Sequence, residues 1–152
     1  MSITTIANLV AILSGAVIYG TDVFCALVVR PAAAGAADAS IADLIGRVHE
    51  YGDRRLPLPG VVAILATALS GVTAPDNAAR MIGAIAFLAL LAWLAIYLRI
   101  SAPINAKLRA AAASGSVPSD TSELQHRWDR VIWPRAALQG VALASLLLML
   151  AR

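Results

Sequence analysis

Four long, mostly apolar stretches limit what this chain can fold into. They cover residues 3–29, 56–73, 81–100 and 131–151. A helix needs about 20 apolar residues to cross the hydrocarbon core of a bilayer. The first, third and fourth stretches reach that length, whereas the second is short and begins among prolines. We therefore expect an all-α fold, in which residues 1–152 form a single integral membrane four-helix bundle with cytoplasmic helical extensions.

The composition excludes several other classes of protein. Hydrophobic residues make up 60% of the chain and charged residues 14%, whereas a soluble domain carries roughly 45–50% and about 25%. The single cysteine, Cys25, excludes a disulfide framework. Although the net charge is +3, the chain has no long basic run, so we expect membrane lipid and no nucleic acid among its partners.

The positions of the basic residues predict how the chain is oriented. Two long polar connections, residues 30–55 and 101–130, alternate with a tight turn at residues 74–80, so four spans would place both long connections on one side. Of the 12 Lys and Arg residues, only Arg80 and Arg152 lie on the other side. Cytoplasmic connections carry the excess of Lys and Arg. We therefore expect a multi-pass plasma membrane protein with both termini outside.

The long connections contain helical patterns of their own. Residues 38–55 have apolar residues at helical spacing, and this helix is expected to enter the membrane at the prolines that follow it. Residues 119–138 should run into the fourth span as one helix, with a kink or the membrane boundary at Pro134. Pro103 is expected to end the third helix, and the residues from Ala110 onward are expected to form a small-residue linker.

One face of the first span is small and polar, and it contains an acidic residue. A charge inside a bilayer costs at least ~2.5–3.5 kcal/mol unless it is paired or neutralised. Asp22 is therefore either a functional group or one half of a structural ion pair. Its expected partner is Arg135, one turn inside the fourth span, with Arg54 and Arg55 as competitors, and Gln139 extends the same polar pocket. The polar face consists of Thr4, Asn8, Ala11, Gly15, Tyr19, Asp22, Ala26 and Arg30.

The two histidines lie on the side of the long connections. His49 precedes Asp53 by four residues, which places both on one helix face, and His126 precedes Asp129 by three. Two histidines and a carboxylate form an open site suited to iron or copper. His49, Asp53 and His126 are thus candidate metal ligands. For His126 a solvated helix position is the simpler interpretation, and a site with no cofactor at all stays open.

Three short motifs resemble those of the anthrone-oxygenase-like family of small four-helix membrane proteins. The first is a Gly-rich first span that ends near a proline, "GTDVFCALVVRPA". The second is "APINAKL" after the third span, with Pro103 and Asn105. The third is "RWDRVIWPRAAL", with Trp128 and Arg135. The chain departs from the family at residues 132–134, where members often carry Asn or His just before the arginine.

The resemblance implies an oxygenase that acts on a polycyclic aromatic ketone such as an anthrone, at its activated methylene. That reaction needs a base to remove a proton from carbon, and positive charge or hydrogen-bond donors to hold the enolate oxygen. Oxygen would then react with the enolate directly or at a metal held by the histidines. The candidate bases are Asp22, His49 and Asp53, and the candidate oxyanion-holding residues are Arg55, Asn105 and Arg135.

Two other classes of function fit the same sequence. The acidic residue in the first span suits a small proton-coupled transporter, although such exporters show little charge bias between the two sides of the membrane. The polar residues within the spans would also suit a non-catalytic subunit or assembly factor of a membrane complex. The small residues of the first span allow helix packing within one chain or between chains, so a homo-oligomer is also compatible with the sequence.

Overall fold

The computed structural model describes all 152 residues, and the chain is almost entirely helical, with no strand. The prediction of an all-α fold is confirmed. Three π-helical segments, in which one turn holds an extra residue, interrupt the helices: η1 (Cys25–Val29), η2 (Ile41–Ile45) and η3 (Tyr97–Ser101). The α-helices are α1 (Ile3–Phe24), α2 (Arg30–Ala34), α3 (Asp38–Ser40), α4 (Gly46–Arg55), α5 (Pro57–Val72), α6 (Asn77–Ile96), α7 (Ala102–Ser114) and α8 (Thr121–Leu150).

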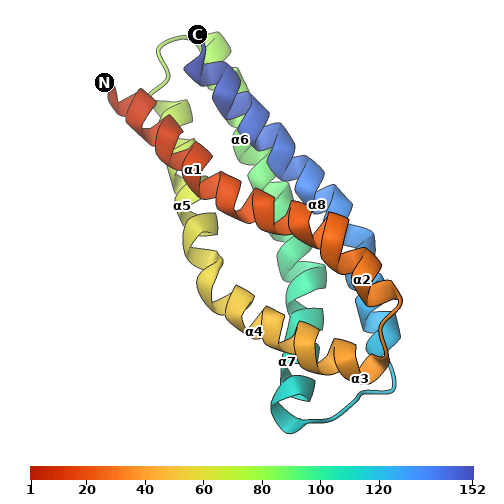
Figure 1. Ribbon diagram of the computed structural model, residues 1–152. Coiled ribbons are helices and arrows are strands. Elements are labelled where there is room, and N and C mark those ends of the chain that lie inside the picture. The colour runs from red at the N-terminus through yellow and green to blue at the C-terminus, as the bar shows by residue number, and fades with distance from the viewer.

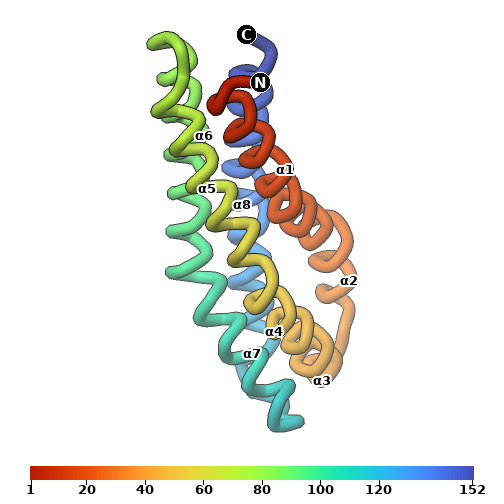
Figure 2. The backbone as a smooth tube through the Cα atoms, turned by 90° about the vertical axis from the view of Figure 1, so that its left-hand side faces the viewer, coloured from red at the N-terminus to blue at the C-terminus, as the bar shows by residue number.

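Helices α1, α5, α6 and α8 form an elongated bundle (Figures 1 and 2). Helix α1 packs against α5 and α8, and α6 packs against the same two helices. Both termini and the α5–α6 turn lie at one end of the bundle (Figure 1). We call the opposite end, where α3, α4, α7 and the first turns of α8 lie, the α3–α7 end.

Three continuous helical stretches are long and apolar enough to cross a membrane: Ile3–Ala34, Asn77–Ser114 and Thr121–Leu150. The sequence predicted four spans. A fourth exists only if Asp38–Arg55 and Pro57–Val72 are taken together as one span bent by 42°. The bend falls at the prolines that follow α4, because a proline lacks the backbone N–H that a continuous helix requires.

The helices extend further toward the α3–α7 end than the sequence predicted. Pro103 does not end the third helix, because it lies in the first turn of α7 and helical structure continues to Ser114. A proline is tolerated there, since the first N–H groups of a helix have no partner within it. The linker expected from Ala110 begins only at Gly115, whose positive φ of 66° closes the helix. Helix α8 does continue through Pro134, as predicted.

Small side chains let the long helices approach closely in the half of the bundle that holds the termini. Leucine side chains on the outer surface are largely exposed, for example Leu13 (69%), Leu58 (72%) and Leu88 (62%). Close backbone approach through small residues, with large aliphatic residues facing outward, is typical of helices packed in lipid. The buried core of this half consists of Ala11, Ala63, Ala86, Ala89, Leu90, Ala142 and Leu146.

Gly46 is the closest point between α4 and α7, and it provides a first testable prediction. An added methyl group would overlap the Leu108 carbonyl oxygen and the Ala112 side chain. Gly46→Ala should therefore destabilise the protein by about 1–3 kcal/mol, because α4 and α7 must move apart. Gly20→Ala is the control, since nothing lies within 4 Å of the added carbon. Unfolding in detergent measures both, and equal stabilities of the two variants would contradict this packing.

Candidate functional site

A cavity of about 380 Å³ lies near the bend between α4 and α5. Its walls come from helices α1, α4, α5, α6 and α8, and all three π-helical segments border it. π-Helical turns occur frequently at functional sites, because the extra residue re-aims the side chains around it. Most of the lining is apolar, and the polar and aromatic members are Thr21, Asp22, His49, Asp53, Trp93, Tyr97, Asn105, Gln125, Trp128 and Arg135.

A buried ion pair joins α1 to α8 beside this cavity. Arg135 Nη2 donates to Asp22 Oδ1 at 2.8 Å, and both side chains are at most 7% exposed. The other carboxylate oxygen, Oδ2, accepts hydrogen bonds from Gln139 Nε2 at 2.8 Å and from Trp93 Nε1 at 3.3 Å. The predicted pairing of Asp22 with Arg135 is confirmed. Three donors therefore hold the Asp22 carboxylate in place.

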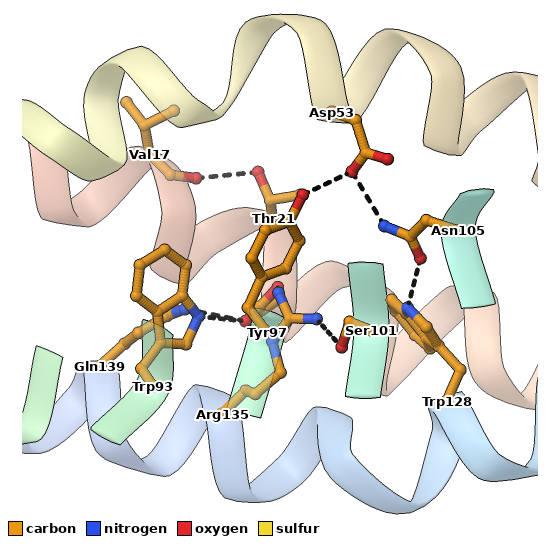
Figure 3. Close-up of polar contacts among 11 residues, drawn as sticks. Val17, Thr21, Asp53, Trp93, Tyr97, Ser101, Asn105, Trp128, Arg135 and Gln139 are labelled. Atoms are coloured by element: carbon orange, nitrogen blue, oxygen red, sulfur yellow. Dashed lines mark hydrogen bonds and ion pairs between the residues drawn. The ribbon is translucent and has the colours of Figure 1, made fainter. Parts of the chain in front are cut away.

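Two of the three guanidinium nitrogens of Arg135 make hydrogen bonds, and the third has no partner. Its Nη1 donates to Ser101 Oγ at 2.8 Å, in addition to the bond to Asp22 (Figure 3). The guanidinium carbon lies 5.6 Å from the ring centroid of Tyr97 and 5.8 Å from that of Trp128. Its Nε is buried and has no hydrogen-bond partner. A fixed, positively charged group with an unused N–H is suited to hold an oxygen atom that carries negative charge.

A second network holds Asp53 in place. Its Oδ1 accepts hydrogen bonds from Tyr97 Oη at 2.8 Å and Asn105 Nδ2 at 2.9 Å (Figure 3). Arg109 Nη1 lies 3.3 Å from Oδ2. Asn105 in turn accepts a hydrogen bond from Trp128 Nε1 at 3.1 Å. The network ties α4 to η3, α7 and α8. Asp53 and Asn105 therefore border the cavity with their polar atoms already engaged, as parts of its frame.

His49 lines the cavity and makes no hydrogen bond through its side chain. It is 7% exposed, its ring centroid lies 5.5 Å from that of Trp128, and its buried Nε2 has no partner. Five of the ten residues of α4 are charged, so this helix lies outside the apolar spans. Burial lowers the pKa of His49 to about 4, and the nearby Asp53 carboxylate only partly opposes this shift. The imidazole is therefore neutral at pH 7, and one of its ring nitrogens carries a free lone pair.

The predicted metal ligands are not assembled. No group of three or more His, Cys, Asp or Glu side chains is arranged to hold a metal ion. His126 is exposed on α8 and does not border the cavity. The reason is helical periodicity, which turns the neighbouring Gln125 and Trp128 inward and His126 outward. The proposed set of His49, Asp53 and His126 is therefore incorrect as a metal site.

Arg55, expected near the oxyanion, is also absent from the cavity lining. It is exposed, and its guanidinium carbon lies 5.3 Å from the ring centroid of Tyr51. Arg54 pairs at 2.9 Å with Glu50 at the surface of the same helix, so neither arginine competes for Asp22. The end of α4 turns both side chains away from the bundle.

Gln125 lines the cavity, although it was not among the site residues predicted from the sequence. Its side chain is 3% exposed, and its Nε2 donates to Asp129 Oδ1 at 2.9 Å. Its Oε1 is buried without a partner. The signal that could have identified it is its spacing along α8. Gln125 lies three residues before Trp128 and ten before Arg135, and all three share the buried face.

Three unpartnered polar atoms thus belong to cavity residues: His49 Nε2, Gln125 Oε1 and Arg135 Nε. Small-molecule sites combine apolar walls with a few such polar groups, and they commonly measure about 300–1,000 Å³. The arrangement fits a flat, largely apolar molecule that carries a small number of polar atoms. Compared with known proteins, the chain matches no family model, no curated protein and no solved structure.

Proposed function

We propose that this protein is a membrane-embedded oxygenase of the anthrone-oxygenase type, which oxidises a polycyclic aromatic ketone in the cavity beside α4. The main support is that one apolar cavity contains both a neutral imidazole with an unpartnered Nε2 and an arginine with an unpartnered Nε–H. These are the base and the oxyanion donor required to remove a proton from a methylene that is conjugated with a carbonyl. The motifs around Asn105, Trp128 and Arg135 support the same family.

In the proposed reaction, His49 Nε2 removes a proton from the activated methylene of the ketone. The resulting enolate oxygen accepts a hydrogen bond from Arg135 Nε–H, and the ion pair with Asp22 fixes that guanidinium. Molecular oxygen adds to the enolate carbon, and the peroxide anion takes back the proton from His49. The hydroperoxide then loses water to leave a second carbonyl group. The balance is CH₂ + O₂ → C=O + H₂O, so no residue of the protein is oxidised or reduced.

The candidate bases are thereby narrowed from three residues to one. Asp22 and Asp53 each accept three polar contacts, so their oxygens are not free to take a proton from a ligand. In this proposal they are positioning residues that act through Arg135 and Asn105. The rings of Trp93, Tyr97 and Trp128 provide the aromatic surface against which a flat ketone packs.

The cavity has apolar lining residues that also reach the molecular surface. Val48, Val61 and Leu98 border it and are 46%, 53% and 57% exposed. A polycyclic aromatic ketone partitions into the bilayer, where its concentration far exceeds that in water. We infer that the substrate reaches the cavity from the lipid, through an opening between helices rather than from the aqueous end.

We further propose a four-span bundle in the plasma membrane, in which α5, the apolar half of the bent pair, crosses the membrane and α4 lies with the rest of the α3–α7 end in the cytoplasm. All but two of the 12 basic residues lie at or near that end, and the termini lie at the other. A reporter enzyme that works only outside the cytoplasm, fused after Arg152, should be active. Activity of a cytoplasm-only reporter at the same position would reverse the orientation.

The function is tested by oxygen uptake of the purified protein in detergent, with anthrone as substrate. We expect protein-dependent consumption of one O₂ per anthrone and formation of anthraquinone, above the reaction without protein. A transporter or a non-catalytic subunit would add nothing to the background rate. Absence of protein-dependent uptake while the folded protein still binds anthraquinone would limit the cavity to ligand binding and overturn the oxygenase proposal.

A further inference from the structure

The amide of Gln125 is the polar group of the cavity for which the proposed reaction has no use. It lies on the buried face of α8 next to Trp128, and its Oε1 has no partner among the protein atoms. A buried acceptor without a partner lowers stability by about 1–3 kcal/mol. A ligand that donates a hydrogen bond to this oxygen would remove that penalty.

Asp129 fixes which end of the amide is available. The Asp129 carboxylate can only accept hydrogen bonds, so the amide nitrogen must point toward it, as the 2.9 Å contact from Gln125 Nε2 to Oδ1 shows. The oxygen is then necessarily the free end. Oε1 is thus an acceptor without a donor, on a residue that lines the cavity. A ligand that carries a donor can satisfy it, and a ligand without one cannot.

Gln125 and Arg135 lie at separate positions along α8. They are ten residues apart, about 15 Å along the helix axis. Trp128 lies between them, in contact with both the His49 ring and the Arg135 guanidinium. A ligand whose carbonyl oxygen is held at Arg135 would therefore extend past His49 and Trp128 before it reaches Gln125. Its donor group must lie at the end of the molecule remote from the carbonyl.

We propose that Gln125 is a specificity-determining residue that selects aromatic ketones carrying a hydroxyl or amino group at the end remote from the reacting carbonyl. This inference rests on the proposed function for the carbonyl at Arg135. The donor requirement itself depends only on the free Oε1 and its fixed orientation.

The test compares binding of 6-hydroxy-2-acetonaphthone and 6-methoxy-2-acetonaphthone, in which the remote oxygen carries either a hydrogen or a methyl group. Titration calorimetry on the full chain in detergent gives both dissociation constants. The wild-type protein should bind the hydroxy compound about 10-fold tighter, since the methoxy compound leaves Oε1 unpartnered. In Gln125→Met this preference should disappear. His126→Met, on the neighbouring exposed position, is the control and should keep the preference.

Each outcome decides the inference. Equal binding of the two ketones by the wild-type protein overturns it, even if Gln125→Met fails to fold. A preference that persists in Gln125→Met overturns it as well, because another residue must then recognise the hydroxyl. The binding measurement is independent of turnover. A preference for the hydroxy compound without oxygen uptake would defeat the oxygenase proposal and support the role of Gln125. Oxygen uptake without that preference would support the oxygenase proposal and overturn the role of Gln125.

Discussion

His49→Ala should lower kcat/KM for the anthrone by about 10²–10⁴-fold, the usual contribution of a general base. The effect on folding should be small, because the imidazole makes no side-chain hydrogen bond that the substitution would break. The matched control is His126→Ala, in which the exposed histidine of α8 is removed. Oxygen uptake and unfolding in detergent should be measured on the same preparations.

The pH dependence provides a second readout for the same residue. A base whose pKa is near 4 is already unprotonated at neutral pH, so kcat/KM should stay level from about pH 8 to about pH 6. It should fall only as the pH approaches 4, where the imidazole becomes protonated. Wild-type activity in His49→Ala, or a decline in kcat/KM through about pH 6.5 in the wild-type protein, would contradict the assignment of a buried, neutral base.

Asp22→Asn and Arg135→Gln should each lower the free energy of unfolding by about 3–5 kcal/mol, because either change leaves the other charge buried without its partner. The double variant should lose less than the sum of the two single losses. The exposed pair of Asp43 and Arg47 is the matched control, since its ions are also 2.8 Å apart but both side chains are at least 60% exposed. Asp43→Asn should therefore cost no more than about 1 kcal/mol.

Reversible unfolding in mixed detergent gives the free energy of unfolding of these four variants and of the wild-type protein. The coupling between Asp22 and Arg135 is the quantity of interest, since each residue also has other partners in Gln139, Trp93 and Ser101. Additive losses in the double variant would show that the two charges act independently. That result would contradict the view that the ion pair fixes the guanidinium beside the cavity.

The parts of the site that follow from local rules were predictable from the sequence. A charged residue in an apolar span needs a partner of opposite charge at the same depth. That requirement pointed to Arg135 as the partner of Asp22, with Arg54 and Arg55 as competitors. Helical spacing likewise placed His49 on the buried face of its helix, and the prolines after Arg55 marked the bend. Each of these predictions depends on residue spacing within one helix, or on the relative depth of two helices, which the order of the spans already determines.

The parts that depend on the relative rotation of several helices were not predictable. His126 and Gln125 are neighbours, and only the packing of α8 decides which of them turns inward. The segment from Tyr97 to Ser114 was expected to break at Pro103. Instead η3 and α7 continue the helix and bring Tyr97 and Asn105 within hydrogen-bond distance of Asp53. No spacing rule connects these residues, since Asp53 is separated from them by more than 40 positions.

The most direct test of the oxygenase account is turnover of anthrone under ¹⁸O₂, followed by mass spectrometry of the quinone. After subtraction of the protein-free reaction, the wild-type protein should add one ¹⁸O atom to each quinone molecule, because the new carbonyl oxygen comes from O₂ and the other oxygen atom leaves as water. His49→Ala should form almost none of this product. A protein-dependent quinone that carries no label, or an equal labelled yield with and without the protein, would contradict the account.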